Sequence, residues 1–332
     1  MLRLATVGTS AITEKFLAAC RLTGRYAFHT AFSRSAEKGR DFARAQGFRH
    51  SASDLRAVAR DPAVDAVYIA TPNVFHYAQS KLFLENGKHV ICEKPIATDC
   101  RQYDELLALA EKKGLVYAEA IISRHSAGRQ VLRDALGQIG GIAMARLDFC
   151  QRSSRCDAFR RGEPVNIFDM SLGAGTLMDL GVYAVYAALD LFGMPEQVTA
   201  SAVLADKGAD LAGTAVFRYR GFPAVLSYSK IGQSVVGSEI IGDRGAVRIG
   251  SISQYADLTL VKDGRETPLW GTPDRAEVMR GEAAAFADYI EARDAFSEEY
   301  RRVCALTHQV HHCMDLVKQS AGLHYPLRDC RL

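Results

Sequence analysis

The sequence predicts an α/β protein with two domains. The first is built on a parallel sheet, and the second is an α+β domain with an open, mostly antiparallel sheet. The chain has 332 residues, and at roughly 150 residues per domain this length suggests two domains. The first third alternates apolar strand patterns with helical patterns, which is typical of a parallel sheet covered on both faces. Beyond residue 124 strand patterns follow one another directly, so we expect domains over 1–123 and 124–332.

In the first domain the strands are short apolar runs, and the helices have recognisable ends. Leu2–Val7 is a strand that ends at Gly8. Thr98 or Asp99 can cap a helix that runs to Lys113 and ends at Gly114. Further strands are expected at Tyr26–Ser33, Ala66–Ala70, His89–Cys92 and Leu115–Ala118, and helices at Ile12–Thr23, Ala36–Gln46, Ser53–Ala59 and Phe75–Asn86.

In the second domain, turn signals separate successive strands. Arg220-Gly221 and the run from Gly242 to Gly245 are typical of hairpins between antiparallel strands. Strands are expected at Ile142–Gln151, Val198–Leu204, Gly213–Tyr219, Pro223–Ser229, Ser238–Ile241, Ala246–Ile249 and Leu258–Val261, and helices at Gly175–Phe192, Arg280–Arg293 and Glu298–Ser320.

Composition and charge exclude several classes of protein. Hydrophobic residues make up 48% and charged residues 24% of the chain, as in ordinary globular proteins. Lys and Arg number 41 against 38 Asp and Glu, a net charge of +3, which is too small for a general nucleic-acid binder. No apolar run reaches the roughly 18 residues of a membrane span, and the N-terminus reads as a strand rather than a targeting signal. The eight cysteines include no CxxC pair, so we expect free thiols and a cytoplasmic protein.

The turn after the first strand has the position of a phosphate-binding turn. It reads Gly8-Thr9-Ser10-Ala11-Ile12-Thr13, between a strand and a helix N-terminus. A dinucleotide fold uses such a turn to offer backbone N–H groups to a pyrophosphate. Only the first glycine of the GxGxxG/A pattern is present, and Ser10 replaces the second. The alternative is an ordinary strand–helix turn, and the surrounding strand–helix alternation favours nucleotide binding.

The end of the second strand predicts the nucleotide. An NAD site usually has an acid there for the ribose 2′-hydroxyl, whereas this chain has Ser33-Arg34-Ser35 and then Lys38. Arg34 can bind a 2′-phosphate through its planar guanidinium, and the serines can donate to it. We therefore expect NADP, with NAD as the alternative. Arg34 would then be an ordinary surface residue.

Two further strand ends carry polar residues at the edge where ligands bind. Thr71-Pro72-Asn73, with His76 behind it, follows one strand, and Glu93-Lys94-Pro95 follows the next. We expect these residues to contact the cofactor. Lys94 is aimed so that it can bond a substrate hydroxyl and the nicotinamide ribose. The alternative is a solvated surface lysine.

A proton-transfer site is predicted on the helix after residue 175. Asp179 and Tyr183 are four residues apart and therefore share a helix face. A tyrosine has an ordinary pKa near 10, so proton transfer near neutral pH requires a cation that favours the phenolate. Lys94 is the candidate cation, and Asp179 the candidate orienting carboxylate. The alternative is a buried tyrosine bonded to Asp179 without any chemistry.

A metal site is not expected. Cys304, His308 and His311 share a helix face, but a closed zinc site usually needs a fourth ligand. The same residues fit a helix packing surface, which is the interpretation we adopt.

Together these motifs resemble the Gfo/Idh/MocA oxidoreductase family. The resemblance rests on the Gly-Thr-Ser turn, on Thr71-Pro72-Asn73 with His76, on Glu93-Lys94-Pro95 and on the Gly-x-Gly-x-Leu-x-Asp-x-Gly-x-Tyr motif that ends at Tyr183. With tyrosine as its last residue, the motif is similar to that of the branch that contains dimeric dihydrodiol dehydrogenase, glucose–fructose oxidoreductase and NADP xylose dehydrogenases. The family implies a Rossmann domain, a sheet domain that often forms a homodimer or larger oligomer, and hydride transfer between a nicotinamide and a secondary alcohol or carbonyl.

The resemblance also implies roles for individual residues. Tyr183 would be the general acid/base, and Lys94 its electrostatic partner and a substrate contact. Asp179 would orient the site, and Arg152 and Arg155 would contact the substrate. Polarity and resemblance together suggest a sugar, polyol or cyclic diol as substrate. The alternative is an NADP-binding sensor or regulatory subunit without turnover.

Overall fold

The computed structural model describes residues 1–206, 208–292 and 297–325. They form two compact units. Among the described residues, the first unit contains Met1–Ile121 and also residues from Asp274 to Cys304, and the second contains Ile122–Pro273 and residues from Ala305 to Tyr325. The single division expected after residue 123 stays a prediction. Cys330 and the expected helix end at Arg293 lie outside the described residues.

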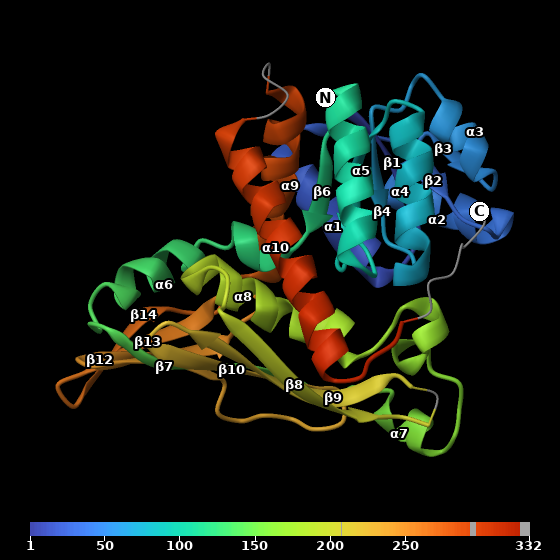
Figure 1. Cartoon of the computed structure of the whole chain (residues 1–332). Helices are drawn as coiled ribbons and strands as arrows, with labels where there is room; N and C mark the ends of the chain where they lie inside the picture. Colours follow the sequence, from blue (N-terminus) through green and yellow to red (C-terminus); the bar gives the residue numbers. More distant parts are fainter. Residues whose placement is uncertain (207, 293–296, 326–332) are drawn as a thin grey trace. The chain divides into compact units, whose positions relative to one another are not determined.

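The first unit contains a six-stranded parallel sheet with the order β3-β2-β1-β4-β5-β6 (Figure 1). This is the doubly wound order of dinucleotide-binding folds, so the predicted Rossmann fold is confirmed. Its strands are β1 (Leu2–Val7), β2 (Tyr26–Phe32), β3 (His50–Ala52), β4 (Ala66–Ile69), β5 (His89–Glu93) and β6 (Tyr117–Ala120). The carboxyl ends of these strands meet at one edge, where the polar residues singled out in the sequence are found.

Helices flank this sheet, and their ends follow local sequence signals. The Asp99 carboxylate accepts from the amides of Arg101 and Gln102, and Gly114 ends the same helix in the left-handed conformation. Late in the chain a further helix returns to pack against the first one, and the Tyr26 hydroxyl donates to the Ala283 carbonyl over 2.6 Å. The helices are α1 (Ala11–Thr23), α2 (Ala36–Gln46), α3 (Leu55–Arg60), α4 (His76–Glu85), α5 (Cys100–Lys113) and α9 (Arg275–Glu291), while α10 (Glu298–Ser320) runs from this unit into the second.

The second unit contains an eight-stranded sheet with the order β14-β13-β12-β11-β7-β10-β9-β8. All neighbouring strands are antiparallel except β7 and β10, which run parallel. The predicted open, mostly antiparallel sheet is thus confirmed. Its strands are β7 (Ile142–Cys150), β8 (Gln197–Leu204), β9 (Asp210–Tyr219), β10 (Phe222–Ser229), β11 (Ser238–Gly242), β12 (Gly245–Ser251), β13 (Ala256–Lys262) and β14 (Arg265–Trp270).

One face of this sheet is covered by helices. α6 (Gly128–Leu136) and α8 (Val182–Phe192) pack on the same face (Figure 1). Along β9, Ala215 and Phe217 are buried while the intervening Val216 and Arg218 are exposed, so the opposite face is open. A short helix, α7 (Cys156–Arg160), follows β7.

The helix expected from Gly175 to Phe192 is only partly α-helical. Leu177–Gly181 forms a turn of π-helix, and α8 begins after it at Val182. Such single π turns are frequent at functional sites. Among the described residues, no helix is both long and apolar enough to cross a membrane.

Candidate functional site

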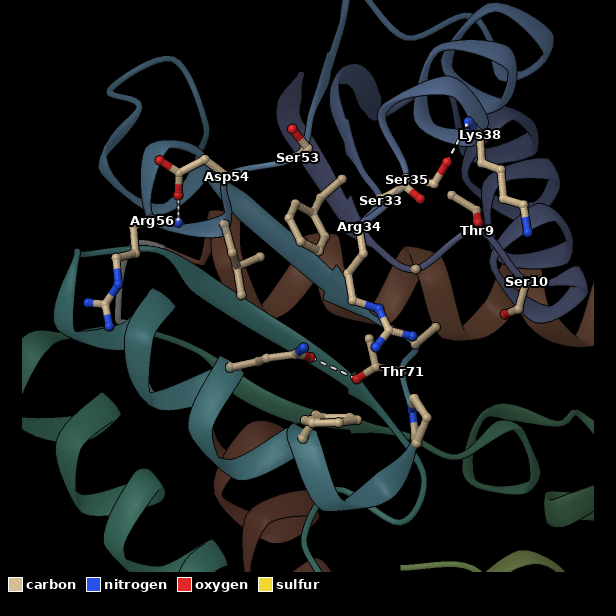
Figure 2. Close-up of a pocket in the computed structure, with 17 residues that line it drawn as sticks. Thr9, Ser10, Ser33, Arg34, Ser35, Lys38, Ser53, Asp54, Arg56 and Thr71 are labelled. Carbon is tan, nitrogen blue, oxygen red and sulfur yellow. Dashed lines mark hydrogen bonds between the residues drawn. The ribbon is translucent and has the colours of Figure 1, made fainter. Parts of the chain in front are cut away.

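A cavity of about 900 Å³ lies in the first unit at the carboxyl ends of β1, β2, β3 and β4 (Figure 2). Its lining joins three segments that the sequence analysis chose separately: the turn after β1, the end of β2 and the end of β4. The predicted cofactor residues that line it are Gly8, Thr9, Ser10, Ser33, Arg34, Lys38, Thr71 and Pro72. The position matches the ligand crevice of doubly wound folds.

The turn after β1 depends on Gly8. Gly8 has φ of +113°, and a Cβ placed on it would lie 2.5 Å from the Ala70 carbonyl oxygen at the end of β4. The backbone can therefore turn tightly into α1 only without a side chain at this position. Ser10 is the N-cap residue of α1, but its side chain makes no capping hydrogen bond. The first amides of α1 are thus suited to an anionic phosphate.

Positive charge collects at the end of β2. Arg34 extends from this end into the pocket, and Lys38 lies one turn into α2 (Figure 2). Asp54 is the one acid among the described residues that line the cavity. Its carboxylate accepts from the amides of Arg56 (2.9 Å) and Ala57 (3.3 Å) and caps α3. The end of β2 therefore offers cations and hydroxyls to a ligand.

Part of the lining was not predicted from the sequence. The segment from Ser53 to Arg56 enters the pocket because β3 is a sixth parallel strand whose carboxyl end lies at the same edge. β3 has only three residues and its sequence, His-Ser-Ala, carries no apolar run. The short helix expected from Ser53 was the signal in the sequence that could have identified this segment as part of the lining. The other unpredicted lining residues are Phe32, Ala70, Phe75 and Gln79, whereas Ser35, expected to donate to a 2′-phosphate, also lines the cavity.

Other predicted cofactor residues do not line this cavity: Ala11, Ile12, Asn73, His76, Glu93 and Lys94. Their assignment stays a prediction. His76 is fully buried, with Nδ1 2.9 Å from the Pro95 carbonyl oxygen and Nε2 2.8 Å from that of Thr71. Burial lowers the pKa of His76. This imidazole therefore links the loop after β4 to the loop after β5.

Buried acids hold the backbone around Lys94. The Tyr68 hydroxyl donates to Glu93 Oε1 over 2.5 Å, and the Lys94 amide donates to Glu93 Oε2 over 3.2 Å. The Ile96 amide donates to Glu119 over 2.8 Å. Burial raises the pKa of Glu93, although its hydrogen bond from Tyr68 favours the charged form. The Lys94–Pro95 step thus has a defined backbone, from which the lysine side chain projects.

In the second unit, Asp210 of β9 anchors the start of the π turn. Its carboxylate accepts from the amides of Thr176 (3.0 Å) and Leu177 (2.6 Å), and the Tyr325 hydroxyl donates to it over 3.2 Å. Burial raises the pKa of Asp210, while these hydrogen bonds favour its charged form. The segment that carries Asp179 and Tyr183 is therefore tied to the sheet by a buried acid.

Replacing Gly175 by alanine is expected to release this anchor. Gly175 has φ of +153°, and an added Cβ would lie 2.1 Å from Asp210 Oδ1 and 2.5 Å from the Tyr325 hydroxyl. The displaced, buried carboxylate would lose its donors, so we expect the free energy of unfolding to fall by about 2–4 kcal/mol. Urea denaturation measures this loss. Gly271→Ala is the control, because nothing lies within 4 Å of an added Cβ there; equal stability of the two variants would contradict the prediction.

Asp179 and Tyr183 lie on either side of the change from π- to α-helix. The predicted helix is therefore α-helical only from Val182 onward, and the shared face of Asp179 and Tyr183 stays a prediction. The Asp179 carboxylate forms an ion pair with Lys230, whose side chain is 6% exposed against 43% for Asp179. Tyr183 is 7% exposed, and its ring meets the edge of Phe149 at a centroid distance of 5.6 Å. Lys230, which directly follows the last residue of β10, was not predicted from the sequence.

The two predicted substrate arginines follow β7. Arg152 forms an ion pair with Asp157 on α7, and its amide donates to Gln233 over 3.3 Å. Arg155 is exposed at the N-terminus of α7. Their role as substrate contacts stays a prediction.

The fold and the cavity define a two-unit protein that binds a dinucleotide. Family models agree with this class: residues 2–121 match "Oxidoreductase family, NAD-binding Rossmann fold", and residues 129–248 match "GFO/IDH/MocA C-terminal domain". Among curated proteins, scyllo-inositol 2-dehydrogenase (NADP(+)) IolU of Bacillus subtilis strain 168 is 36% identical over 98% of this chain and 99% of its own. Trans-1,2-dihydrobenzene-1,2-diol dehydrogenase of Xenopus laevis is 29% identical over 74% of this chain and 73% of its own.

A solved structure shares the fold at lower identity. The 3-ketoreductase KijD10 of Actinomadura kijaniata, in complex with NADP and TDP-benzene, superposes with a TM-score of 0.84 at 22% identity, over 96% of this chain and 98% of its own. The chain belongs to the Gfo/Idh/MocA oxidoreductase family, as its motifs predicted.

Proposed function

We propose that this protein is an NADP-dependent dehydrogenase or reductase. Its substrate would be a neutral polyhydroxy molecule with a secondary alcohol, or the matching carbonyl. The observation that carries the cofactor choice is the cationic end of β2, where Arg34 and Lys38 line the cavity and Asp54, the one acid among the described lining residues, caps a helix. A 2′-phosphate gains charge-assisted hydrogen bonds from such a surface. The NADP named for the inositol dehydrogenase of Bacillus subtilis supports the same choice.

Replacing Arg34 by alanine tests the cofactor. We expect the Kd for NADP to rise about 10- to 100-fold, because a guanidinium–phosphate contact is lost. The Kd for NAD, which has no 2′-phosphate, is expected to stay within about twofold of its original value. Titration of both nucleotides by calorimetry measures the two constants. Arg44→Ala is the matched control, since this exposed arginine of α2 does not line the cavity. Equal weakening of NAD and NADP by Arg34→Ala would contradict the assignment.

Three of the predicted site residues have a task in this reaction. When bound, the nicotinamide supplies hydride exchange with the alcohol carbon. Tyr183 moves the hydroxyl proton as general acid and base. Asp179 accepts a hydrogen bond from a substrate hydroxyl, and Lys94 donates one.

Charge balance in the second unit supports a neutral substrate. Two cations of this unit are matched by acids: Lys230 pairs with Asp179, and Arg152 pairs with Asp157. Such a surface offers many hydrogen bonds but little net charge, which suits hydroxyl groups better than carboxylates or phosphates. The relatives are named for an inositol and a dihydrodiol, and we extend this class to a sugar, polyol or cyclic diol here.

A substrate panel tests the reaction. Purified protein with NADP is offered inositols, aldoses and trans-dihydrodiols, and the absorbance of the reduced nicotinamide is followed. We expect turnover with at least one of these alcohols. Tight NADP binding without turnover on any of them, or on the matching ketones with NADPH, would favour the sensor function instead.

The sheet of the second unit has an exposed apolar face that suits self-association. The open face of the sheet carries exposed Val203 and Val216, so we assign it to a homodimer or larger homo-oligomer. Light scattering of the purified protein tests this assignment.

The described cysteines are all free thiols and mostly buried, which suits the reducing cytoplasm. We assign cofactor binding to residues 1–123 and substrate binding to 124–332.

A further inference from the structure

Lys230 is a buried lysine that the predicted reaction does not use. It directly follows β10, and its backbone is fixed on both sides. Its amide donates to the Leu211 carbonyl over 3.0 Å, and its carbonyl accepts from the Ser153 amide over 2.8 Å. From this fixed position the side chain, 6% exposed, reaches the Asp179 carboxylate. The sheet therefore supplies a cation to the π turn that carries the predicted proton-transfer residues.

Burying an ammonium group is unfavourable unless an acid compensates it. A lysine whose only purpose was solubility would keep its charge in water. Here the burial is uneven, because Asp179 stays 43% exposed while Lys230 is almost covered. The cation thus holds the carboxylate from the protein side, while part of the Asp179 side chain remains exposed.

The π turn is held to the sheet at two points. Asp210 binds its first amides, and Lys230 binds the side chain of Asp179 three residues after Thr176. Neither contact is local in the sequence. A π turn is less favourable than an α turn and persists where the surroundings stabilise it. The two anchors therefore fix the direction of Asp179.

We propose that Lys230 is a positioning residue for the oxidoreductase reaction, which holds the Asp179 carboxylate ionised and oriented as the acceptor of a substrate hydroxyl. This inference rests on the proposed function. It assigns Lys230 no contact with the reacting atoms and distinguishes it from Lys94.

Lys230→Met tests the proposal by removing the charge while keeping an unbranched side chain. We expect kcat/KM to fall about 10- to 100-fold, mainly through KM, with the Kd for NADP unchanged. The acid limb of the pH profile is expected to move to higher pH. A neighbouring cation lowers the pKa of a carboxyl, so without it Asp179 takes up its proton at higher pH. Lys230→Arg is expected to restore the profile and most of kcat/KM.

Lys318→Met is the matched structural control. Lys318 is also buried, at 9% exposure, and pairs with Asp315 in the same unit. A loss that reflects only a broken buried ion pair would appear equally in both variants. An unshifted pH profile in Lys230→Met, or the same kinetic loss in Lys318→Met, would overturn the proposal.

A double-mutant cycle identifies the route of the effect. If Lys230 acts through Asp179, then adding Lys230→Met to Asp179→Asn is expected to change kcat/KM by less than about threefold. If the double variant lost kcat/KM by the product of the two separate losses, the proposal would be overturned.

The carboxyl carbon of Asp179, titrated by NMR in the original protein and in Lys230→Met, gives a readout that needs no turnover. A raised pKa of Asp179 in the variant supports the proposal, and an unchanged one overturns it. Absence of turnover in the original protein would instead contradict the proposed function.

Discussion

Tyr183→Phe is expected to lower kcat by about 10²- to 10⁴-fold, the usual contribution of a general acid–base group. The variant keeps the ring and its edge contact with Phe149 but loses the hydroxyl that exchanges a proton with the substrate. NADP binding is expected to stay unchanged, because Tyr183 does not line the cofactor cavity. Steady-state kinetics with the best alcohol of the panel, together with NADP titration, measure both quantities.

Tyr186→Phe is the control for this prediction. Tyr186 lies on the same helix, is 2% exposed and has its hydroxyl 3.0 Å from that of Thr307. Loss of the Tyr186 hydroxyl is expected to lower the free energy of unfolding by about 1 kcal/mol. The kcat of this variant is expected to stay within about twofold of the original value. If Tyr183→Phe retained turnover at the level of Tyr186→Phe, proton transfer would have to be assigned to another group.

Much of the first unit could be predicted because its signals are local. The strand Leu2–Val7, the helix Ala36–Gln46 and the helix that ends at Lys113 have the expected bounds, since apolar runs, caps and glycines mark their ends. β3 and β14 were missed. β3 is polar and three residues long, and β14 is a mostly exposed edge strand that contains Pro268, so hydrophobic periodicity marks neither strand.

The candidate site was predicted where it follows from strand ends, and missed where it depends on pairing. The turn at Gly8 and the residues around Arg34 follow strands that the apolar pattern reveals, and both line the cavity. Lys230 reaches Asp179 only because β10 pairs with β7 and β9 in the sheet. The π turn likewise depends on a buried acid of β9, more than thirty residues later. Neither contact leaves a local pattern in the sequence.

Gly8→Ala is expected to weaken NADP binding more than 100-fold and to lower the free energy of unfolding by about 2–4 kcal/mol. Two effects combine at this position. A φ of +113° is unfavourable for any residue with a side chain, and the added Cβ would lie 2.5 Å from the backbone oxygen of Ala70. A backbone atom at the end of a buried strand cannot rotate away, so the turn after β1 must shift. That shift displaces the first amides of α1 from the place where a pyrophosphate would bind.

Gly47→Ala separates the two effects. Gly47 ends α2 with φ of +73°, but nothing lies within 4 Å of an added Cβ. In this variant only the positive φ is unfavourable, so the free energy of unfolding is expected to fall by about 1 kcal/mol. Its affinity for NADP is expected to be unchanged. Denaturant unfolding and nucleotide titration of both variants give the comparison. If Gly8→Ala bound NADP as tightly as Gly47→Ala does, the close approach to Ala70 would not shape a phosphate site, and the cofactor would have to bind elsewhere.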